Sequence, residues 1–289
     1  MIRTASERLI PLVRQLAVSA VCIASVVAVT HAQAVRLQIK PRVGDTLRLR
    51  IEQEMEISGV GKVRAADTTM TMRSSMLMLS RSIVVESDTE GTTVRSITDS
   101  VAVDMGAMDP QVASLSDQAR RALQGKELRV RFSREGSATV LEADPDIPRN
   151  LQSVSSQLPA TFPRHPVSIG STWKQRIPIP DAVQGQFAGT LEAVLRLDSI
   201  THRGKRAYIS MRGTFTRDSA AAPIAGGARL VMTGTVTGFM ILDRTRGWVT
   251  DASIEMFVRS RTEPTAGSTV PPMRMQMRLI RRQRTMDKM

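Results

Sequence analysis

The sequence predicts a protein of the α+β class that is mainly β. We expect a long, curved antiparallel sheet, a half-barrel, with two mid-chain helices packed on one face. The first observation is an alternation of apolar and polar residues through most of the chain after residue 34. The second is the length of these runs, because long strands favour a strongly curved sheet. The third is a change of apolar spacing from two to three and four in two segments near the middle of the chain.

The chain opens with a segment that predicts export. Arginines, among them Arg3 and Arg14, precede the apolar run 16–29, and small residues follow it at Ala32 and Ala34. A basic region, an apolar region and an A-x-A site in this order are typical of a secretory signal peptide. We therefore expect residues 1–34 to be a cleaved signal peptide, cut after Ala32 or after Ala34. The mature protein is then secreted or periplasmic.

Two alternatives to cleavage fit the opening segment less well. A transmembrane anchor needs about 20 apolar residues, more than this run offers. A lipoprotein signal needs a small residue directly before the cysteine, whereas Val21 precedes Cys22. Cys22 is the only cysteine of the chain and leaves with the signal peptide. The mature chain is then expected to form no disulfide, thiolate metal site or thiol nucleophile.

Half-buried antiparallel strands are predicted wherever apolar and polar residues alternate. In the first such run Leu47, Leu49 and Ile51 alternate with arginine and glutamate. The runs with this pattern are, in chain order, 47–57, 70–80, 94–103, 128–132, 139–141, 191–199, 207–215, 228–242, 252–258 and 273–279. Glycine-containing turns that close hairpins are predicted at 88–91, 133–136, 202–204 and 243–247.

Two helices are predicted between the strand blocks. Apolar residues recur every three or four positions in 110–123 and in 147–158, as on one face of an amphipathic helix. Asp146 is placed to cap the second helix, and Pro148 suits its first turn. We expect both helices to pack on the same face of the sheet.

Residues 35–289 are expected to form a single β-rich domain, for which two interpretations remain. The segment 43–51 is echoed by 169–177, since Gly-x-Thr leads into a strand in both. An internal duplication would give related halves, 35–143 and 164–285, joined by the helical segment 144–163. Alternatively, Gly-x-Thr is simply a common way to begin a strand.

The sequence offers no constellation for catalysis or for a metal. His165 and His202 lie in turn-like segments without a second histidine at ligand spacing. There is no nucleophile elbow, P-loop or dinucleotide fingerprint. The carboxylates Asp104, Asp109 and Asp144 are expected in loops without partners. We therefore predict that the protein is not an enzyme and has no cofactor and no metal.

The formal net charge of +13 narrows the expected partners. Basic proteins attract phosphate-bearing partners, but only 3% of residues are aromatic, which leaves little to stack on single-stranded nucleic acid. Export also separates the protein from the genome, so no nucleic-acid partner is expected. The densest basic segment, 278–284, is either a solvated strand end or a contact with an anionic membrane surface.

One segment carries a resemblance to a known group of proteins. Its pattern LP…P…V…G…W consists of Leu158, Pro159, Pro166, Val167, Gly170 and Trp173. It resembles a linker in uncharacterised secreted bacterial proteins whose layout is similar to the lipoprotein-carrier (LolA-like) superfamily. The resemblance implies a curved antiparallel sheet with helices on its concave side. It implies no catalytic residue, and a carrier's lipid cargo does not follow from a shared fold.

Methionine is unusually frequent and is patterned. Two stripes at period two are expected to face one side of their strands: Met70, Met72, Met76 and Met78, and Met273, Met275 and Met277. Because methionine is flexible and polarizable, such a surface can adapt to varied apolar ligands. Alternatively, the stripes fill a core that is poor in aromatics. Capture of copper(I) by thioether sulfur is a weaker hypothesis, since no histidine or cysteine supports it.

These observations predict an exported, non-enzymatic binding protein of the cell envelope. It would hold an apolar or lipid-like ligand between the sheet and the helices, with the seven methionines as the binding residues. The alternative is a structural or interaction module with a filled core and no small ligand. The sequence specifies neither the ligand nor the oligomeric state.

Overall fold

The computed structural model describes residues 34–63, 66–106, 110–147, 161–180, 187–217, 228–264, 266–268 and 271–286. The chain divides into two compact units, Met1–Gln33 and Ala34–Met289, and every described residue belongs to the second. The expected signal peptide therefore lies outside the described residues, apart from Ala34, and its cleavage stays a prediction. Within the described ranges, no helix has the length and apolar character that crossing a membrane requires.

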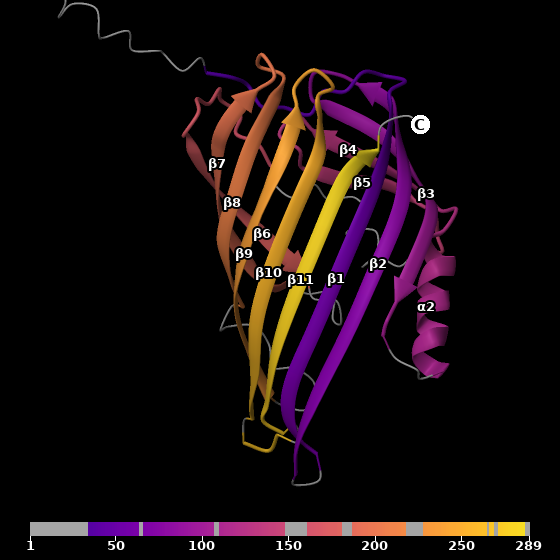
Figure 1. Cartoon of the computed structure of the whole chain (residues 1–289), viewed down its shortest axis with the longest axis vertical. Coiled ribbons are helices and arrows are strands. Elements are labelled where there is room, and N and C mark those ends of the chain that lie inside the picture. The colour runs from indigo at the N-terminus through magenta and orange to yellow at the C-terminus, as the bar shows by residue number, and fades with distance from the viewer. Residues whose placement is uncertain are drawn as a thin grey trace, which may run out of the picture. The chain divides into compact units, whose positions relative to one another are not determined.

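Eleven strands form one antiparallel sheet that is open and curled (Figure 1). Their order across the sheet is β5-β4-β3-β2-β1-β11-β10-β9-β8-β7-β6. The strands are β1 (Thr46–Val63), β2 (Ala66–Ser87), β3 (Gly91–Asp104), β4 (Glu127–Ser133), β5 (Ala138–Ala143), β6 (Thr172–Pro180), β7 (Phe187–Thr201), β8 (Arg206–Thr216), β9 (Ala228–Asp243), β10 (Trp248–Pro264) and β11 (Met273–Met286).

The predicted antiparallel sheet is confirmed, and so are its hairpins. Each of the predicted strands lies within one of these elements, and the four predicted turns join β2 to β3, β4 to β5, β7 to β8 and β9 to β10. From the centre the chain builds outward from β1 to β5, then continues at the opposite edge with β6 and returns to the centre at β11. One continuous sheet results, while the proposed duplication stays a prediction.

The described part of the chain contains one short helix where two were expected. This helix, α2 (Pro110–Leu123), follows β3 and packs beside it (Figure 1). Leu123, its last residue, is buried in the core. The second expected helix, 147–158, falls outside the described residues except for Ile147. Asp146 is described, and its carboxylate binds Lys126 Nζ at 2.5 Å.

The alternation in the sequence gives the sheet two different faces. The outer face carries exposed ion pairs between neighbouring strands, such as Arg278 Nε to Glu255 Oε1 at 2.7 Å and Arg282 to Glu54 at 3.4 Å. Exposed pairs of this kind contribute little, at most about 1 kcal/mol each. The inner face is apolar, and one buried cluster joins residues from both halves of the sheet. Burial of this face is therefore the main stabilising term.

One end of the curled sheet is closed by the segment 34–45, which crosses it at the top of Figure 1. Val35 pairs with Val167 through two backbone hydrogen bonds, of 2.8 and 2.9 Å. Ile39 N donates to Arg134 O, and Lys40 N donates to Gly247 O, each at 2.8 Å. The segment is thus tied to three separate parts of the chain.

The side chains of this segment complete the core at that end. Leu37 and Ile39 are fully buried in the same cluster as Phe132 and Trp248. The rings of Phe132 and Trp248 pack edge to face, with their centroids 5.1 Å apart. Gly247 permits the close approach, because a Cβ there would lie 2.3 Å from the Lys40 backbone. Its φ of 63° also lies in the left-handed region that favours glycine.

The segment 158–173, which carries the family resemblance, is held to the start of β6 by hydrogen bonds of Trp173 and Gln175. Trp173 donates its indole N–H to Thr161 O at 3.0 Å, and Gln175 Oε1 accepts from Thr161 N at the same distance. Gly170 adopts a φ of 89°, in the left-handed region that favours glycine. Trp173 therefore anchors the start of β6. Leu158 and Pro159 of the same pattern lie outside the described residues.

Replacement of Ile39 by alanine should lower the free energy of unfolding by about 2–5 kcal/mol, because it leaves a cavity at a fully buried site. Lys40→Ala, at the adjacent exposed position, should change it by less than about 0.5 kcal/mol. Urea unfolding followed by circular dichroism measures both. Equal effects of the two variants would show that the segment does not belong to the folded core.

Candidate functional site

The two predicted methionine stripes lie on the same face of the sheet, on either side of β1. Gly59 is opposite Met70 on β2 and Met275 on β11. Ile57 is opposite Met72 and Met277 in the same way. Since directly opposed residues of antiparallel strands point to the same side, the stripes form one surface.

We call this surface the methionine face. It comprises Met55, Met70, Met72, Met76, Met78, Met256, Met273, Met275 and Met277, contributed by β1, β2, β10 and β11. All seven predicted binding residues are therefore brought together, and Met55 and Met256 are added to them. The sequence held the period-two signal for each strand, but it did not show which strands are neighbours.

Exposure changes along the methionine face. Met78 is only 2% exposed and belongs to the core, as the packed-core interpretation predicted for the whole stripe. Met76 and Met277 are partly buried against the core. Met72 and Met70, nearer the β1–β2 turn, are 43% and 56% exposed. The methionine face thus begins in the core and ends as an open apolar surface.

Arg281 is a residue of the inner face that the sequence interpretation missed. In the register it lies between Gln53 on β1 and Ile254 on β10, two residues beyond Leu279. Burial lowers the pKa of its guanidinium. Within the described part of the chain, its side chain has neither a hydrogen bond nor an ion pair.

The signal for Arg281 was present in the sequence. It continues the period-two series Met273, Met275, Met277 and Leu279, which places it on the methionine face. The dense positive charge of the segment 278–284, to which Arg281 also belongs, hides this alternation. Arg278 and Arg282 of that segment do lie on the outer face, where they pair with glutamates.

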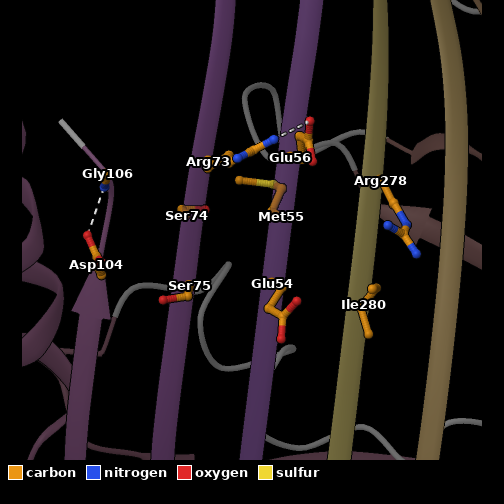
Figure 2. Close-up of a pocket in the computed structure, with 10 residues that line it drawn as sticks. All are labelled: Glu54, Met55, Glu56, Arg73, Ser74, Ser75, Asp104, Gly106, Arg278 and Ile280. Atoms are coloured by element: carbon orange, nitrogen blue, oxygen red, sulfur yellow. Dashed lines mark hydrogen bonds and ion pairs between the residues drawn. The ribbon is translucent and has the colours of Figure 1, made fainter.

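A pocket of about 360 Å³ lies on the opposite, outer face (Figure 2). Its charged lining residues are Glu54, Glu56, Arg73, Asp104 and Arg278. Arg73 pairs with Glu56 at 3.4 Å, and Asp104 Oδ1 accepts from Gly106 N at 2.8 Å. Both carboxylates are therefore occupied by local structural contacts.

The carboxylates that were expected to stand alone have partners where they are described. Asp104 caps the turn at Gly106, and Asp144 pairs with Lys126 at 3.3 Å. The expectation failed because Lys126 and Asp144 lie far apart in sequence and meet only through β4–β5 pairing. Asp109 is outside the described residues. Both histidines are exposed in turns, as predicted, and no group of three or more His, Cys, Asp or Glu in the described ranges could hold a metal.

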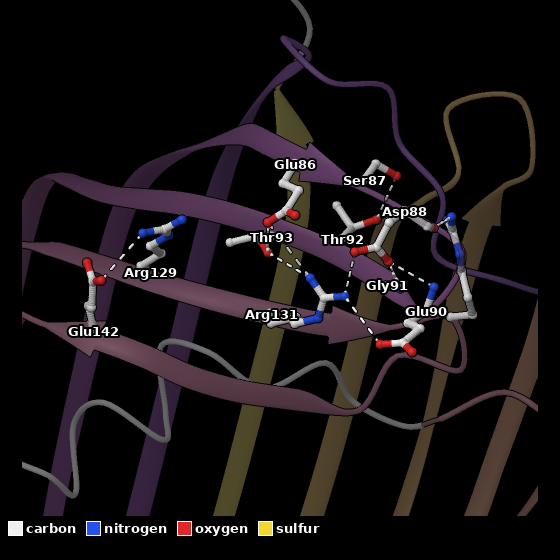
Figure 3. A network of polar contacts seen from close by, with 11 residues as sticks. Glu86, Ser87, Asp88, Glu90, Gly91, Thr92, Thr93, Arg129, Arg131 and Glu142 are labelled. Carbon is white, nitrogen blue, oxygen red and sulfur yellow. Dashed lines mark hydrogen bonds and ion pairs between the residues drawn. The ribbon is translucent and has the colours of Figure 1, made fainter.

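A polar network joins the β2–β3 turn to β4 (Figure 3). Arg131 binds Asp88 at 2.7 Å and Thr93 Oγ1 at 3.3 Å. Asp88 Oδ1 also accepts from the backbone N–H groups of Glu90 at 2.8 Å and Gly91 at 2.9 Å. The hydrogen bond from Arg131, then those from Gly91 and Glu90, lower the pKa of Asp88 from 3.8 to about 2.

This network holds structure in place. Arg134 donates to the backbone carbonyls of Asp88 and Ile39, and so ties the turn to the segment 34–45. The side chains of Asp88, Arg131 and Arg134 all form hydrogen bonds within the protein. The methionine face with Arg281 is therefore the better candidate for a functional site.

The chain is similar to one family of proteins over part of its length. The model of a family of unknown function, DUF6263, matches residues 148–249, about a third of the chain, and the chain is similar to that family there. No curated protein matches. The similarity to the lipoprotein carriers stays a prediction.

Two solved structures are similar only at a low level. The outer membrane protein OprG of Pseudomonas aeruginosa is 6% identical, covers 86% of this chain and 99% of its own, and has a TM-score of 0.20. The translocator domain of the autotransporter NalP of Neisseria meningitidis is 12% identical, covers 93% and 96%, and has a TM-score of 0.15. At these TM-scores neither likeness bears on fold or function.

Asp88→Asn should lower stability at neutral pH and flatten its acid dependence. A carboxylate whose pKa is depressed in the folded state stabilises it above pH 4, and this contribution is lost as the pH falls from about 4 to about 2. Thermal unfolding midpoints between pH 7 and pH 2 measure the effect.

Arg131→Gln is the matched variant for Asp88→Asn, and the double variant should be little worse than either one, because all three remove the same pair. Additive losses would contradict a direct coupling of the two side chains.

Proposed function

We propose that the protein is an exported, non-enzymatic binding protein of the cell envelope that holds an apolar or lipid-like ligand against the methionine face. The observation that carries the proposal is the open end of this face. There Met70 and Met72 lie exposed in a stripe that continues into the core through Met76. Export rests on the signal peptide expected over residues 1–34.

Physical chemistry favours a ligand on such a surface. Large apolar side chains exposed side by side mark binding surfaces more often than single exposed ones do. Methionine adds adaptability, since its unbranched, polarizable side chain can follow an acyl chain of varying shape. The cross-strand rows through β2, β1 and β11 make the surface several side chains wide.

The alternative is a structural module with a filled core, and one observation favours it. The end of the sheet near residues 34–45 is closed, with Leu37, Ile39 and Trp248 fully buried. The two hypotheses differ only at the other end, where the methionines are partly exposed. A ligand-binding measurement on that end therefore separates them.

Met72→Asp should weaken the uptake of a fluorescent long-chain fatty acid by at least about tenfold, because it places a carboxylate against the acyl chain. Its thermal midpoint should stay close to that of the wild type, since Met72 is 43% exposed. Fluorescence titration and thermal unfolding of the same samples measure both quantities.

Thr71→Asp is the matched control, since Thr71 is exposed at the next position of β2 and points to the outer face. It should leave uptake unchanged. A wild-type protein that takes up no probe, together with a Met72→Asp variant that unfolds, would establish the filled core instead.

A further inference from the structure

Arg281 is a cationic side chain on the apolar inner face of the sheet. On the inner face of β11 it follows Met273, Met275, Met277 and Leu279 at intervals of two residues. Its cross-strand neighbours are the uncharged Gln53 and Ile254. The described residues give it no hydrogen bond or ion pair, although Arg278 and Arg282 on the outer face of the same strand pair with glutamates.

A half-buried guanidinium to which the described residues give no partner destabilises the fold that contains it. Removing a charge from water is unfavourable unless an opposite charge and hydrogen bonds compensate. Arginine also stays protonated at all ordinary pH values, so it does not escape the cost by losing its proton. A group that weakens the ligand-free protein in this way is well suited to bind an anion that arrives from outside.

The position of Arg281 relative to the methionine face indicates which anions fit there. The row through Arg281, Gln53 and Met76 lies next to the row of the core residues Met78 and Ile51. From Arg281 to Met273 the stripe extends about 27 Å, at roughly 3.4 Å per residue. One acyl chain spans about 15 Å, half of a bilayer core, so the stripe is long enough for a long chain.

We propose that the ligand of the methionine face is an anionic amphiphile, whose carboxylate or phosphate binds the guanidinium of Arg281 while its hydrocarbon chain lies along the methionines toward Met273. This inference rests on the proposed function and names its ligand class. A planar guanidinium suits either head group, because both accept two parallel hydrogen bonds from it. The amides of Gln53 and Gln283, beside Arg281 in the register, are the nearest further donors.

The test compares head groups on one chain length. Palmitate and palmitoyl lysophosphatidic acid supply a carboxylate and a phosphate, and 1-hexadecanol supplies the same chain without charge. Each competes with a fluorescent fatty acid for the full-length protein below its micellar concentration. Both anions should bind wild-type protein about tenfold to a hundredfold more tightly than the alcohol, the range for hydrogen bonds to a charged group.

Arg281→Met removes the charge and places at this position the same apolar side chain that forms the rest of the methionine face. It should abolish the preference for anions while leaving the affinity for 1-hexadecanol unchanged. The matched control is Arg284→Met, which removes an exposed charge three residues further along β11 and should preserve the preference. A stronger loss for one anion than for the other identifies the head group that Arg281 prefers.

The stability of the ligand-free protein gives a second readout. Arg281→Met should raise the thermal midpoint, since it removes an uncompensated charge, whereas palmitate should stabilise the wild type more than the variant. A lowered midpoint in the variant would mean that a partner within the protein satisfies Arg281, and would overturn the inference.

The outcomes separate this inference from the function on which it rests. If wild-type protein binds 1-hexadecanol as tightly as palmitate, the methionine face binds apolar ligands and the assignment of Arg281 is wrong. If it binds none of the three, the proposed function fails as well. A preference for anions that survives in Arg281→Met would place the head group elsewhere.

Discussion

The antiparallel pairing of β1 with β11 is the constraint on which the rest of the structure depends. It joins the outward-growing strands β1–β5 to the inward-returning strands β6–β11, and so makes one sheet from segments at opposite ends of the chain. Its register also decides which residues share a face. A slip of one residue would turn Met273, Met275 and Met277 to the outer face and bring arginines inward, because side chains alternate strictly along a strand. Because burying those arginines would be unfavourable, the register is strongly specified.

The two ends of the curled sheet solve the same problem in different ways. An apolar inner face must be covered, and at one end the segment 34–45 covers it with Leu37 and Ile39. Backbone hydrogen bonds to Val167, Arg134 and Gly247 hold that segment, so its own polar groups are satisfied as well. At the other end the described residues leave Met70 and Met72 partly open. The fold therefore combines a closed end that provides stability with an end whose apolar side chains are partly exposed.

The sequence predicted local structure well and long-range contacts poorly. Alternation located the strands and glycine-containing turns located the hairpins, because both depend on neighbouring residues. It ended the first strand at residue 57, whereas β1 continues to Val63. Gly59 weakens the local pattern, yet pairing on both sides carries the strand on, and a Cβ at Gly59 would lie only 3.1 Å from Met275 Cγ. The alternation Val35, Leu37, Ile39 was equally visible, but nothing local shows that this segment crosses the end of the sheet. The adjacency of the methionine stripes, and the position of Arg281 away from any partner among the described residues, are likewise products of strand pairing.

A methionine surface and the half-buried Arg281 would make different contributions to recognition. An apolar surface binds in proportion to the area that it buries and discriminates weakly among chains, since one methylene changes affinity by only about 1 kcal/mol. A desolvated guanidinium discriminates strongly, because a ligand without an anionic group leaves the charge uncompensated. The order along β11, with Arg281 next to the core and the methionines toward the strand's beginning, would also give a bound ligand a direction. Its head group would be held where solvent is scarce, and its chain would point toward the exposed end of the sheet. Affinity would then come from the methionines, whereas selectivity and orientation would come from Arg281.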